Sequence, residues 1–246
     1  MAITIQVHRD HGVQEYQVEV VEQQTVLDAL FYIQNEIDPS LAFRCSCRVG
    51  MCGTCGMVIN GKEGLACRTS LYRLGKVVSI EPLRHLPVVK DLVVDMDRFL
   101  SKYQAVEPYL KPRPEVNRPV VLPPHSGLRE DIDLGLECIS CGLCVSACDV
   151  LDLVPEFLGP AALNRAYNLV ADIRDNHDQE RLSIVGRERI GVWQCHTHMS
   201  CVQVCPKNIA PTRAIAHLKR RLIKQTIRGR RVRGVPRMQP ILKGGS

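Results

Sequence analysis

The sequence predicts an α+β protein with two domains: a small sheet domain crossed by one helix, then a domain of helices and loops. Three observations lead to this prediction. Apolar residues alternate along short segments near the N-terminus, prolines crowd residues 105–125, and apolar residues recur at helical spacing beyond them. The length of 246 residues also exceeds the usual size of one domain.

Two strands joined by a tight turn are predicted at the N-terminus. The segment from Arg9 to Gly12 supplies the turn. In both strands the apolar side chains fall on one face, as expected for strands that cover a core. These residues are Ile3, Ile5 and Val7 in the first segment and Tyr16, Val18 and Val20 in the second.

A helix and a second hairpin complete the predicted sheet domain. Thr25 and Asp28 form a capping-box pattern at the start of a short amphipathic helix, which Asp38-Pro39 ends. Asn60-Gly61 suits the turn of a hairpin, and residues 77–80 provide a further strand before Pro82. The helix contains Leu27, Leu30, Phe31 and Glu36.

An extended connector separates the two predicted domains, because prolines recur along it and disfavour regular structure. We place the boundary near Ala105, which gives domains of residues 1–105 and 106–225 and a tail of residues 226–246. Helices are predicted to begin at Gly159-Pro160 and Pro211-Thr212. The connector prolines are Pro108, Pro112, Pro114, Pro119, Pro123 and Pro124, and the first helix places Leu163, Ala166, Tyr167 and Val170 on one face.

Composition points to metal ligation. Aromatic residues make up only 4% of the chain, so its cores need support from something other than large side chains, and 12 cysteines are the obvious source. The chain opens without a secretory apolar segment, and we therefore expect it in a reducing cytoplasm. Closely spaced cysteines in that compartment indicate metal ligands and not a disulfide framework.

The C-terminal segment is strongly basic. From Arg213 to the end there are 11 Lys or Arg and no Asp or Glu, within a chain of net charge +6. Such a segment favours an anionic partner, which could be lipid headgroups, nucleic acid or an acidic protein surface. The alternative is a solvated tail without a partner.

The first cysteine motif is C-x4-C-x2-C, formed by Cys47, Cys52 and Cys55 and completed by Cys67 after eleven residues. This is the spacing of plant-type [2Fe–2S] ferredoxins. Four thiolates hold the irons, while backbone N–H groups of a glycine-rich loop stabilise the cluster's negative charge. Zinc also accepts four thiolates, but the four-residue gap in such a loop is less typical of zinc. Cys45 is left over, and an incidental small residue is the favoured interpretation.

Two further motifs follow the bacterial two-cluster pattern, in which the fourth cysteine of each run binds the other cluster. The second run carries His198 where its second cysteine is expected. Exchanging the fourth cysteines gives one set of four thiolates, suited to [4Fe–4S], and one set of three, suited to [3Fe–4S] because an unligated corner readily loses its iron. The sets are Cys138, Cys141, Cys144 and Cys205, and Cys148, Cys195 and Cys201.

His198 has two interpretations. It binds the open corner as a fourth ligand, since imidazole serves iron in some clusters, or it lies beside a three-iron cluster without binding it. The second interpretation is favoured. Loss of one thiolate also removes negative charge, so the third cluster should be easier to reduce than the second.

In combination, these motifs resemble those of the iron–sulfur subunits of succinate dehydrogenase and fumarate reductase, the succinate:quinone oxidoreductase family. The segments from Glu156 to Leu163 and from Cys205 to Ile215 add to the resemblance, which covers residues 1 to about 225. It implies a β-grasp plant-type ferredoxin domain followed by an all-α bacterial-type two-cluster ferredoxin domain. It also implies electron relay between the FAD of a flavoprotein subunit and a membrane quinone, with [2Fe–2S] nearest the flavin and [3Fe–4S] facing the quinone.

The same resemblance implies partners, location and a quinone pocket. The partners would be the flavoprotein, a transmembrane anchor with or without haem b, menaquinone or ubiquinone, and an anionic membrane surface, but no nucleic acid. The subunit would be peripheral, on the cytoplasmic face of the inner or plasma membrane. Pocket candidates are Asp149, Leu153, His196 and His198.

The flank of the third site departs from the family pattern. Many members have proline and then tryptophan after the fourth cysteine of the first run, whereas this chain has Asp149 to Leu153. Leu153 cannot donate the hydrogen bond that an indole N–H offers. We therefore expect a different quinone pose or a site built more by the anchor.

Substrate chemistry is not expected on this chain, because no nucleotide-binding glycine fingerprint and no acid–base cluster stand out. Two alternatives stay open. One is a related electron-transfer subunit, such as that of a heterodisulfide reductase-like or non-classical fumarate reductase complex. The other is a structural zinc protein whose basic tail binds nucleic acid, which would be colourless where an iron–sulfur protein is brown.

Overall fold

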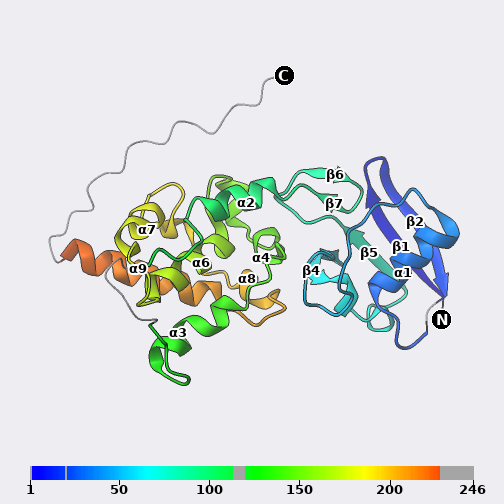
Figure 1. Cartoon of the computed structure of the whole chain (residues 1–246). Helices are drawn as coiled ribbons and strands as arrows, with labels where there is room; N and C mark the ends of the chain where they lie inside the picture. The colour runs from blue at the N-terminus through cyan, green and yellow to red at the C-terminus, as the bar shows by residue number, and fades with distance from the viewer. Residues whose placement is uncertain (1, 20, 113–119, 228–246) are drawn as a thin grey trace.

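A computed structural model of the chain describes residues 2–19, 21–112 and 120–227. Several sequence predictions fall outside them, namely those for Val20, Pro114, Pro119 and the tail from residue 228 onward. The molecule has a sheet domain that contains the N-terminus and a helical domain that ends in the long helix α9 (Figure 1).

The N-terminal hairpin forms as predicted. Strands β1 (Ala2–Arg9) and β2 (Gly12–Glu19) pair antiparallel, with Arg9 opposite Gly12 beside the turn. Apolar and polar side chains alternate along these strands, so that one face of the pair is buried and the other is solvated. The buried residues include Ile3, Ile5 and Val7 of β1 and Tyr16 and Val18 of β2.

The rest of the sheet is built around β1. Within the described residues, five strands lie in the order β2-β1-β5-β3-β4, and only the β1–β5 pair is parallel. The added strands are β3 (Gly56–Ile59), β4 (Lys62–Leu65) and β5 (Val77–Glu81). Asn60 and Gly61 both adopt positive φ, which is what a two-residue hairpin turn between β3 and β4 requires.

Helix α1 (Val26–Tyr32) crosses the sheet (Figure 1). Thr25 caps it by accepting a hydrogen bond from the Asp28 N–H, and the Asp28 side chain accepts from the Thr25 N–H, so the predicted capping box is present. A π-helical turn (Ile33–Ile37) extends the helix to Asp38. Short 3-10 turns at Ala66–Arg68 and Leu71–Arg73 then lead to β5.

A small hairpin and a helix connect the two domains. Strands β6 (Val88–Lys90) and β7 (Val93–Val94) form a separate two-stranded sheet, and α2 (Asp97–Gln104) follows. Helix α2 precedes the predicted boundary near Ala105 but packs against α6 of the helical domain.

Helix α6 (Gly159–Ala171) is the centre of the helical domain, and α2, α3, α4, α7 and α9 all pack against it. The predicted helix starts are both present, because α6 begins at Gly159 and α9 (Pro211–Ile227) at Pro211. The other elements are α3 (Gly127–Leu136), α4 (Leu143–Ser146), α5 (Val150–Leu153), α7 (Asp178–Val185), a 3-10 turn (Val192–Gln194) and α8 (Ser200–Gln203).

Candidate iron–sulfur sites

The first cysteine loop lies between α1 and β3 and is shaped by residues in left-handed backbone. Gly50 and Gly53 have φ of 77° and 75°, and Arg48 has φ of 57°. At Gly50 a Cβ atom would lie 2.9 Å from the Arg68 side chain, so glycine is needed for the loop to close over it. The Arg48 guanidinium stacks over the Phe31 ring at 4.4 Å, which fastens the loop to α1.

Hydrogen bonds to sulfur already exist in this loop. The N–H groups of Met51 and Cys52 donate to Cys47 Sγ at 3.2 and 3.3 Å, and Thr54 Oγ1 donates to Cys52 Sγ at 2.9 Å. The Thr54 hydrogen bond and that from the Cys47 N–H lower the pKa of Cys52 to about 6. Such donors stabilise thiolate charge, as a cluster loop requires.

The other two cysteines of the first set lie deeper. Cys55 and Cys67 are 3% and 6% exposed, and the Ala66 N–H donates to the Cys55 carbonyl at 3.0 Å. Burial raises the pKa of Cys55 to about 12, with the neighbouring Cys67 thiol adding to the rise. The loop therefore has an exposed rim at Cys52 and a buried base at Cys55 and Cys67.

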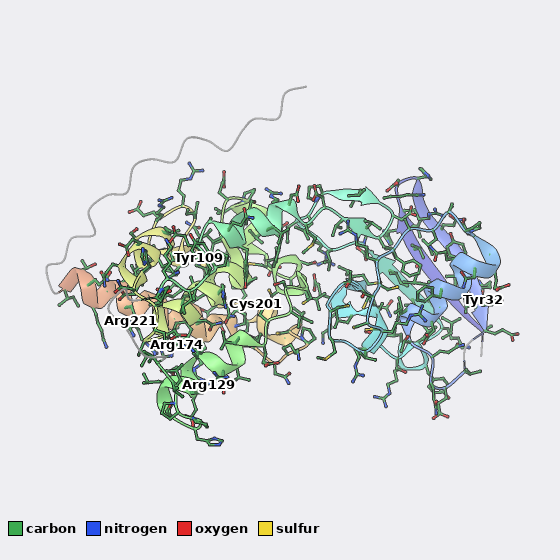
Figure 2. All side chains as sticks on the ribbon, in the orientation of Figure 1. Tyr32, Tyr109, Arg129, Arg174, Cys201 and Arg221 are labelled. Carbon is green, nitrogen blue, oxygen red and sulfur yellow. The ribbon has the colours of Figure 1, made fainter. Side chains whose placement is uncertain are left out.

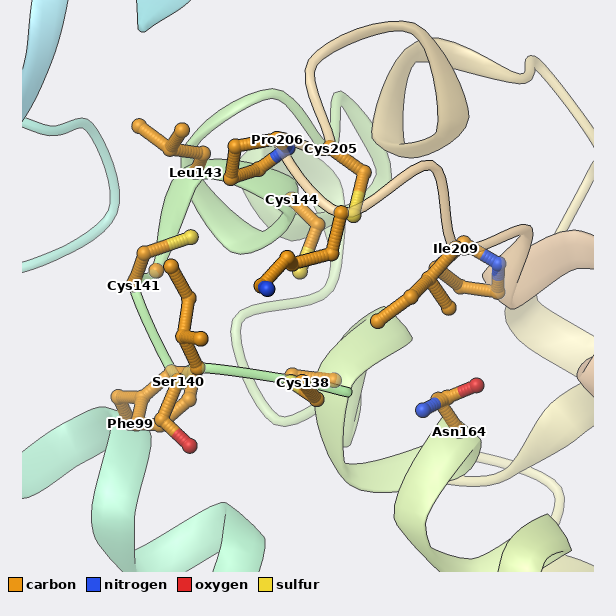
Figure 3. Close-up of a pocket in the computed structure, with 15 residues that line it drawn as sticks. Phe99, Cys138, Ser140, Cys141, Leu143, Cys144, Asn164, Cys205, Pro206 and Ile209 are labelled. Carbon is orange, nitrogen blue, oxygen red and sulfur yellow. The ribbon is translucent and has the colours of Figure 1, made fainter. Parts of the chain in front are cut away.

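The second set of four surrounds one cavity in the helical domain. Cys138, Cys141, Cys144 and Cys205 line it together with Phe99, Leu143 and Ile209 (Figure 3). Burial, with a smaller contribution from the neighbouring thiols of Cys138 and Cys205, raises the pKa of Cys141 to about 11. Cys205 comes from the second run, so the structure places it beside the three cysteines of the first run.

The set of three lines another cavity with α9 at its base. Cys148, Cys195 and Cys201 border it with Thr212 and Ile215. Burial raises the pKa of Cys201 to about 12, and the Cys148 and Cys195 thiols contribute to the rise. This cavity adjoins the previous one, because α4, which carries Cys144 of the second set, packs against α8, which carries Cys201 of the third.

The predicted quinone-pocket residues separate into two groups. Asp149, His196 and His198 line the cavity of the third set, where His198 Nδ1 lies 3.5 Å from Asp149 Oδ2. The His196 and His198 rings are 6.1 Å apart, and both side chains are exposed. Leu153, at the end of α5, faces solvent with 85% of its surface exposed.

Two residues of α9 support the third set and were not singled out from the sequence. Lys219 Nζ donates to the Cys195 carbonyl at 2.8 Å, and Thr212 Oγ1 contacts Met199 Sδ at 3.3 Å. They hold a loop in which Thr197 and Met199 both have positive φ. Thr212 and Lys219 are two helical turns apart and thus share a face of α9. Two polar residues at this spacing on a helix that follows a cysteine run are the sequence signal that could have identified them.

The donor sets fit iron–sulfur clusters. In the helical domain the thiols of each set border one cavity. Sulfide-bridged irons need thiolates of this kind. The described residues also contain no helix long and apolar enough to cross a membrane.

Comparison with known proteins agrees with this geometry. Residues 4–101 match the family model of a 2Fe-2S iron-sulfur cluster binding domain, and residues 135–209 match that of a 4Fe-4S dicluster domain. The predicted fold class is thereby confirmed, with a ferredoxin-type sheet domain followed by a helical two-cluster domain.

Similar proteins share most of the chain's length. The fumarate reductase iron-sulfur subunit of Haemophilus influenzae is 39% identical over 81% of this chain and 82% of its own. The mitochondrial succinate dehydrogenase [ubiquinone] iron-sulfur subunit 1 of Oryza sativa is 42% identical over 79% of this chain and 70% of its own.

A solved structure is similar over nearly the whole chain. A chain of the Mycobacterium smegmatis Sdh1 complex in the apo form aligns with a TM-score of 0.83 and 28% identity, covering 92% of this chain and 97% of that one. Motifs, fold and relatives agree. The chain therefore belongs to the family of iron–sulfur electron-transfer subunits of succinate dehydrogenase and fumarate reductase.

Proposed function

We propose that this chain relays single electrons between the FAD of a flavoprotein subunit and a membrane quinone through three clusters in a row. The observation that carries the proposal is the succession of three cysteine sets. The first loop touches the second set where Gly53 approaches Cys141, and the second set adjoins the third through α4 and α8. When bound, the clusters supply one-electron redox chemistry.

The proposed ligands are those of the sequence analysis. Cys47, Cys52, Cys55 and Cys67 would hold [2Fe–2S], and the set that includes Cys205 would hold [4Fe–4S]. The set of three, which includes Cys148, would hold [3Fe–4S]. Grouping of the thiols around the helical-domain cavities supports the last two assignments. We also retain the division into domains of residues 1–105 and 106–225, followed by the tail.

His198 is proposed to lie beside the third cluster without binding it. Its Nδ1 atom faces the Asp149 carboxylate, and its side chain is 55% exposed. An imidazole that pairs with a carboxylate at the rim of the cavity is suited to proton transfer or to contact with a quinone. His196 occupies the same rim and is the leading candidate for the quinone pocket, whereas Leu153 would contribute only through a partner that covers its exposed side chain.

The partners are proposed on family membership together with surface character. Val49 and Met51 flank the rim at Cys52 with 60% and 61% exposure, so the flavoprotein would cover this apolar surface. A membrane anchor, with or without haem b, would cover the third set and bring menaquinone or ubiquinone to it. The chain would then lie peripherally on the cytoplasmic face of the membrane.

Iron analysis and low-temperature EPR of the purified complex test the proposal. We expect about nine iron atoms per chain and a three-iron signal in the oxidised state that disappears on reduction. About ten irons without a three-iron signal would make His198 a fourth ligand. A colourless, zinc-containing chain would contradict the proposal as a whole.

A further inference from the structure

One buried hydroxyl joins three segments of the chain. Ser146 Oγ donates to Glu63 Oε1 at 2.9 Å and accepts from the Arg84 N–H at 2.9 Å. Glu63 belongs to β4 of the sheet domain, Arg84 follows β5, and Ser146 ends α4 of the helical domain. The hydroxyl is therefore a junction between the two domains.

The carboxylate at this junction is unusual because it is buried. Glu63 is 7% exposed, and its other polar neighbour is the half-exposed Arg84 guanidinium, 3.9 Å from Oε1. Burying a carboxylate costs free energy unless hydrogen bonds and charges compensate it. Removing the Ser146 hydroxyl would leave this group short of a donor, so the contact resists separation of the domains.

The junction lies between the cluster sites. Ser146 stands between Cys144 of the second set and Cys148 of the third, and β4 pairs with β3, which begins directly after Cys55 of the first. Contact between α4 and β4 thus links all three sets.

The domains also approach closely at two glycines of the first loop. A Cβ atom at Gly53 would lie 2.6 Å from Cys141 Cβ, and one at Gly56 would lie 3.1 Å from the Cys141 carbonyl oxygen. The first two sites are therefore separated by little more than backbone, and a small domain movement would change their spacing.

We propose that Glu63 and Ser146 are positioning residues that set the separation of the first two clusters and so the rate at which electrons pass between the domains. The inference rests on the ligand sets proposed above. It assigns the buried contact a role in electron transfer without placing either residue among the ligands.

The test uses the intact complex with Ser146→Ala, Glu63→Ala and Glu63→Gln in this subunit. The measurement is the magnetic interaction between the reduced [2Fe–2S] and [4Fe–4S] clusters in low-temperature EPR, which weakens as their separation grows. We expect partial loss of the interaction in both alanine variants at full iron content. Glu63→Gln should retain it, because an amide oxygen still accepts from Ser146.

The control is Ser101→Ala, because that exposed hydroxyl donates within α2, to the Arg98 carbonyl. An unchanged interaction in Ser146→Ala and Glu63→Ala, with iron complete, would overturn the proposal. A wild-type complex that lacks one of the two clusters would overturn the proposed function instead.

Should the alanine variants lose iron, Gly56→Ala tests the same separation without touching the hydrogen bonds. Its φ is not positive, so the added methyl acts by pressing on Cys141 and Leu143. We expect a weakened magnetic interaction in Gly56→Ala. The interaction should be unchanged in Gly127→Ala, whose Cβ would meet open space. An unchanged Gly56→Ala spectrum would then overturn the proposal.

Discussion

A single arginine fixes the segment that leads into the first cysteine loop. Arg9 donates to both carboxylate oxygens of Asp91 at 3.0 and 3.1 Å and also to Asp38 and Tyr16. Asp91 additionally accepts from the Ala42 N–H at 2.9 Å, shortly before the first cysteine run. Both members of the Arg9–Asp91 pair are buried, so breaking it leaves an uncompensated charge.

The Arg9 network predicts acid sensitivity of the sheet domain. Burial raises the pKa of Asp91, but hydrogen bonds from Arg9 and Ala42 outweigh it, so the folded pKa lies below the usual value. Because the folded pKa is depressed, the stabilisation is complete above the unfolded pKa of about 4 and is lost as pH falls through the folded value. Asp91→Asn should lower the free energy of unfolding by about 3 kcal/mol at pH 7.

Urea unfolding of wild type and variant between pH 3 and pH 7 measures this effect. The difference between them should begin to shrink below about pH 4, where Asp91 becomes protonated in the unfolded chain, and should shrink further as pH falls through the lower folded pKa. Glu15→Gln, on the exposed face of β2, is the control and should change little. A difference that stays constant across this range would contradict the role of the Asp91 charge.

His196 carries the second prediction at this scale. It follows Cys195 directly and borders the third cavity with an exposed ring. Loss of one hydrogen bond in the transition state costs about 1.4 kcal/mol, or about tenfold in rate. His196→Ala should therefore slow quinone reduction about tenfold while succinate oxidation with an artificial acceptor stays normal. His11→Ala, in the exposed N-terminal turn, is the control, and an unaffected His196→Ala would remove this residue from the pocket.

At the scale of elements, local signals predicted those with strong caps or turns. Thr25 with Asp28, Asn60-Gly61 and Gly159-Pro160 each satisfy a backbone requirement through neighbouring residues, so the sequence alone reveals them. The periodic apolar residues that predict β1 and α6 are also buried in the structure.

The missed elements have weaker signals. Helix α3 has an N-cap at Ser126, whose hydroxyl accepts from the Arg129 N–H, but it contains two glycines and buries mainly Ile132. Helix α7 begins at Asp178, and the preceding His177 makes no side-chain cap. Strand β6 is exposed along its length. Packing against α6 stabilises α3 and α7, and tertiary contacts of this kind leave no local trace in sequence.

Helix α9 gives the prediction at this scale. Lys219 brings a positive charge and a hydrogen bond to the carbonyl of Cys195. Reduction adds negative charge to the third cluster, which a nearby cation favours. Lys219→Met should lower the reduction potential of that cluster by roughly 40 mV, which corresponds to about 1 kcal/mol for one electron.

Redox titration followed by EPR measures the potential. Lys224→Met removes an equal charge from an exposed position on the same helix and should shift the potential much less. Equal shifts in both variants would show that overall charge, and not the contact with Cys195, is responsible.

At the scale of the whole molecule, a spacing rule predicts how the two helical-domain cysteine runs combine, whereas no rule predicts the domain contact. The exchange of fourth cysteines follows from a spacing rule, and in the structure Cys205 lines one cavity with Cys138, Cys141 and Cys144, while their role as cluster ligands stays a prediction. Ser146 and Glu63 are separated by 83 positions and match no motif. Only the folded arrangement of the two domains shows that they meet.

The two ends of the molecule differ in surface character. Tyr32, exposed on the sheet domain, and Arg221, exposed on α9, lie toward opposite ends (Figure 2). Arg220, Arg221 and Lys224 are all exposed, and the basic sequence continues beyond the described residues. The helical end thus favours an anionic surface, while apolar residues near the first loop favour a protein partner.

Truncation after residue 226 tests the basic end. Each basic residue near an anionic surface contributes about 1 kcal/mol, and salt screens this attraction. The measurement is a flotation assay with vesicles that contain anionic lipid and the transmembrane anchor subunit. The truncated subunit should dissociate from these vesicles at a lower salt concentration than wild type. Truncation at Gly244, which removes no charge, is the control, and an unchanged salt profile would rule out the tail as an anchor.

The interleaving of Cys148 and Cys205 has a consequence for biogenesis. With the proposed ligands, neither cysteine run can complete a cluster alone, since each lends its last thiol to the other. The chain between the runs contains α6 and α7, and these helices must pack before either site closes. Iron insertion into the helical domain is therefore a late event that reports on finished folding, whereas the first loop, closed within the sheet domain, can be loaded earlier.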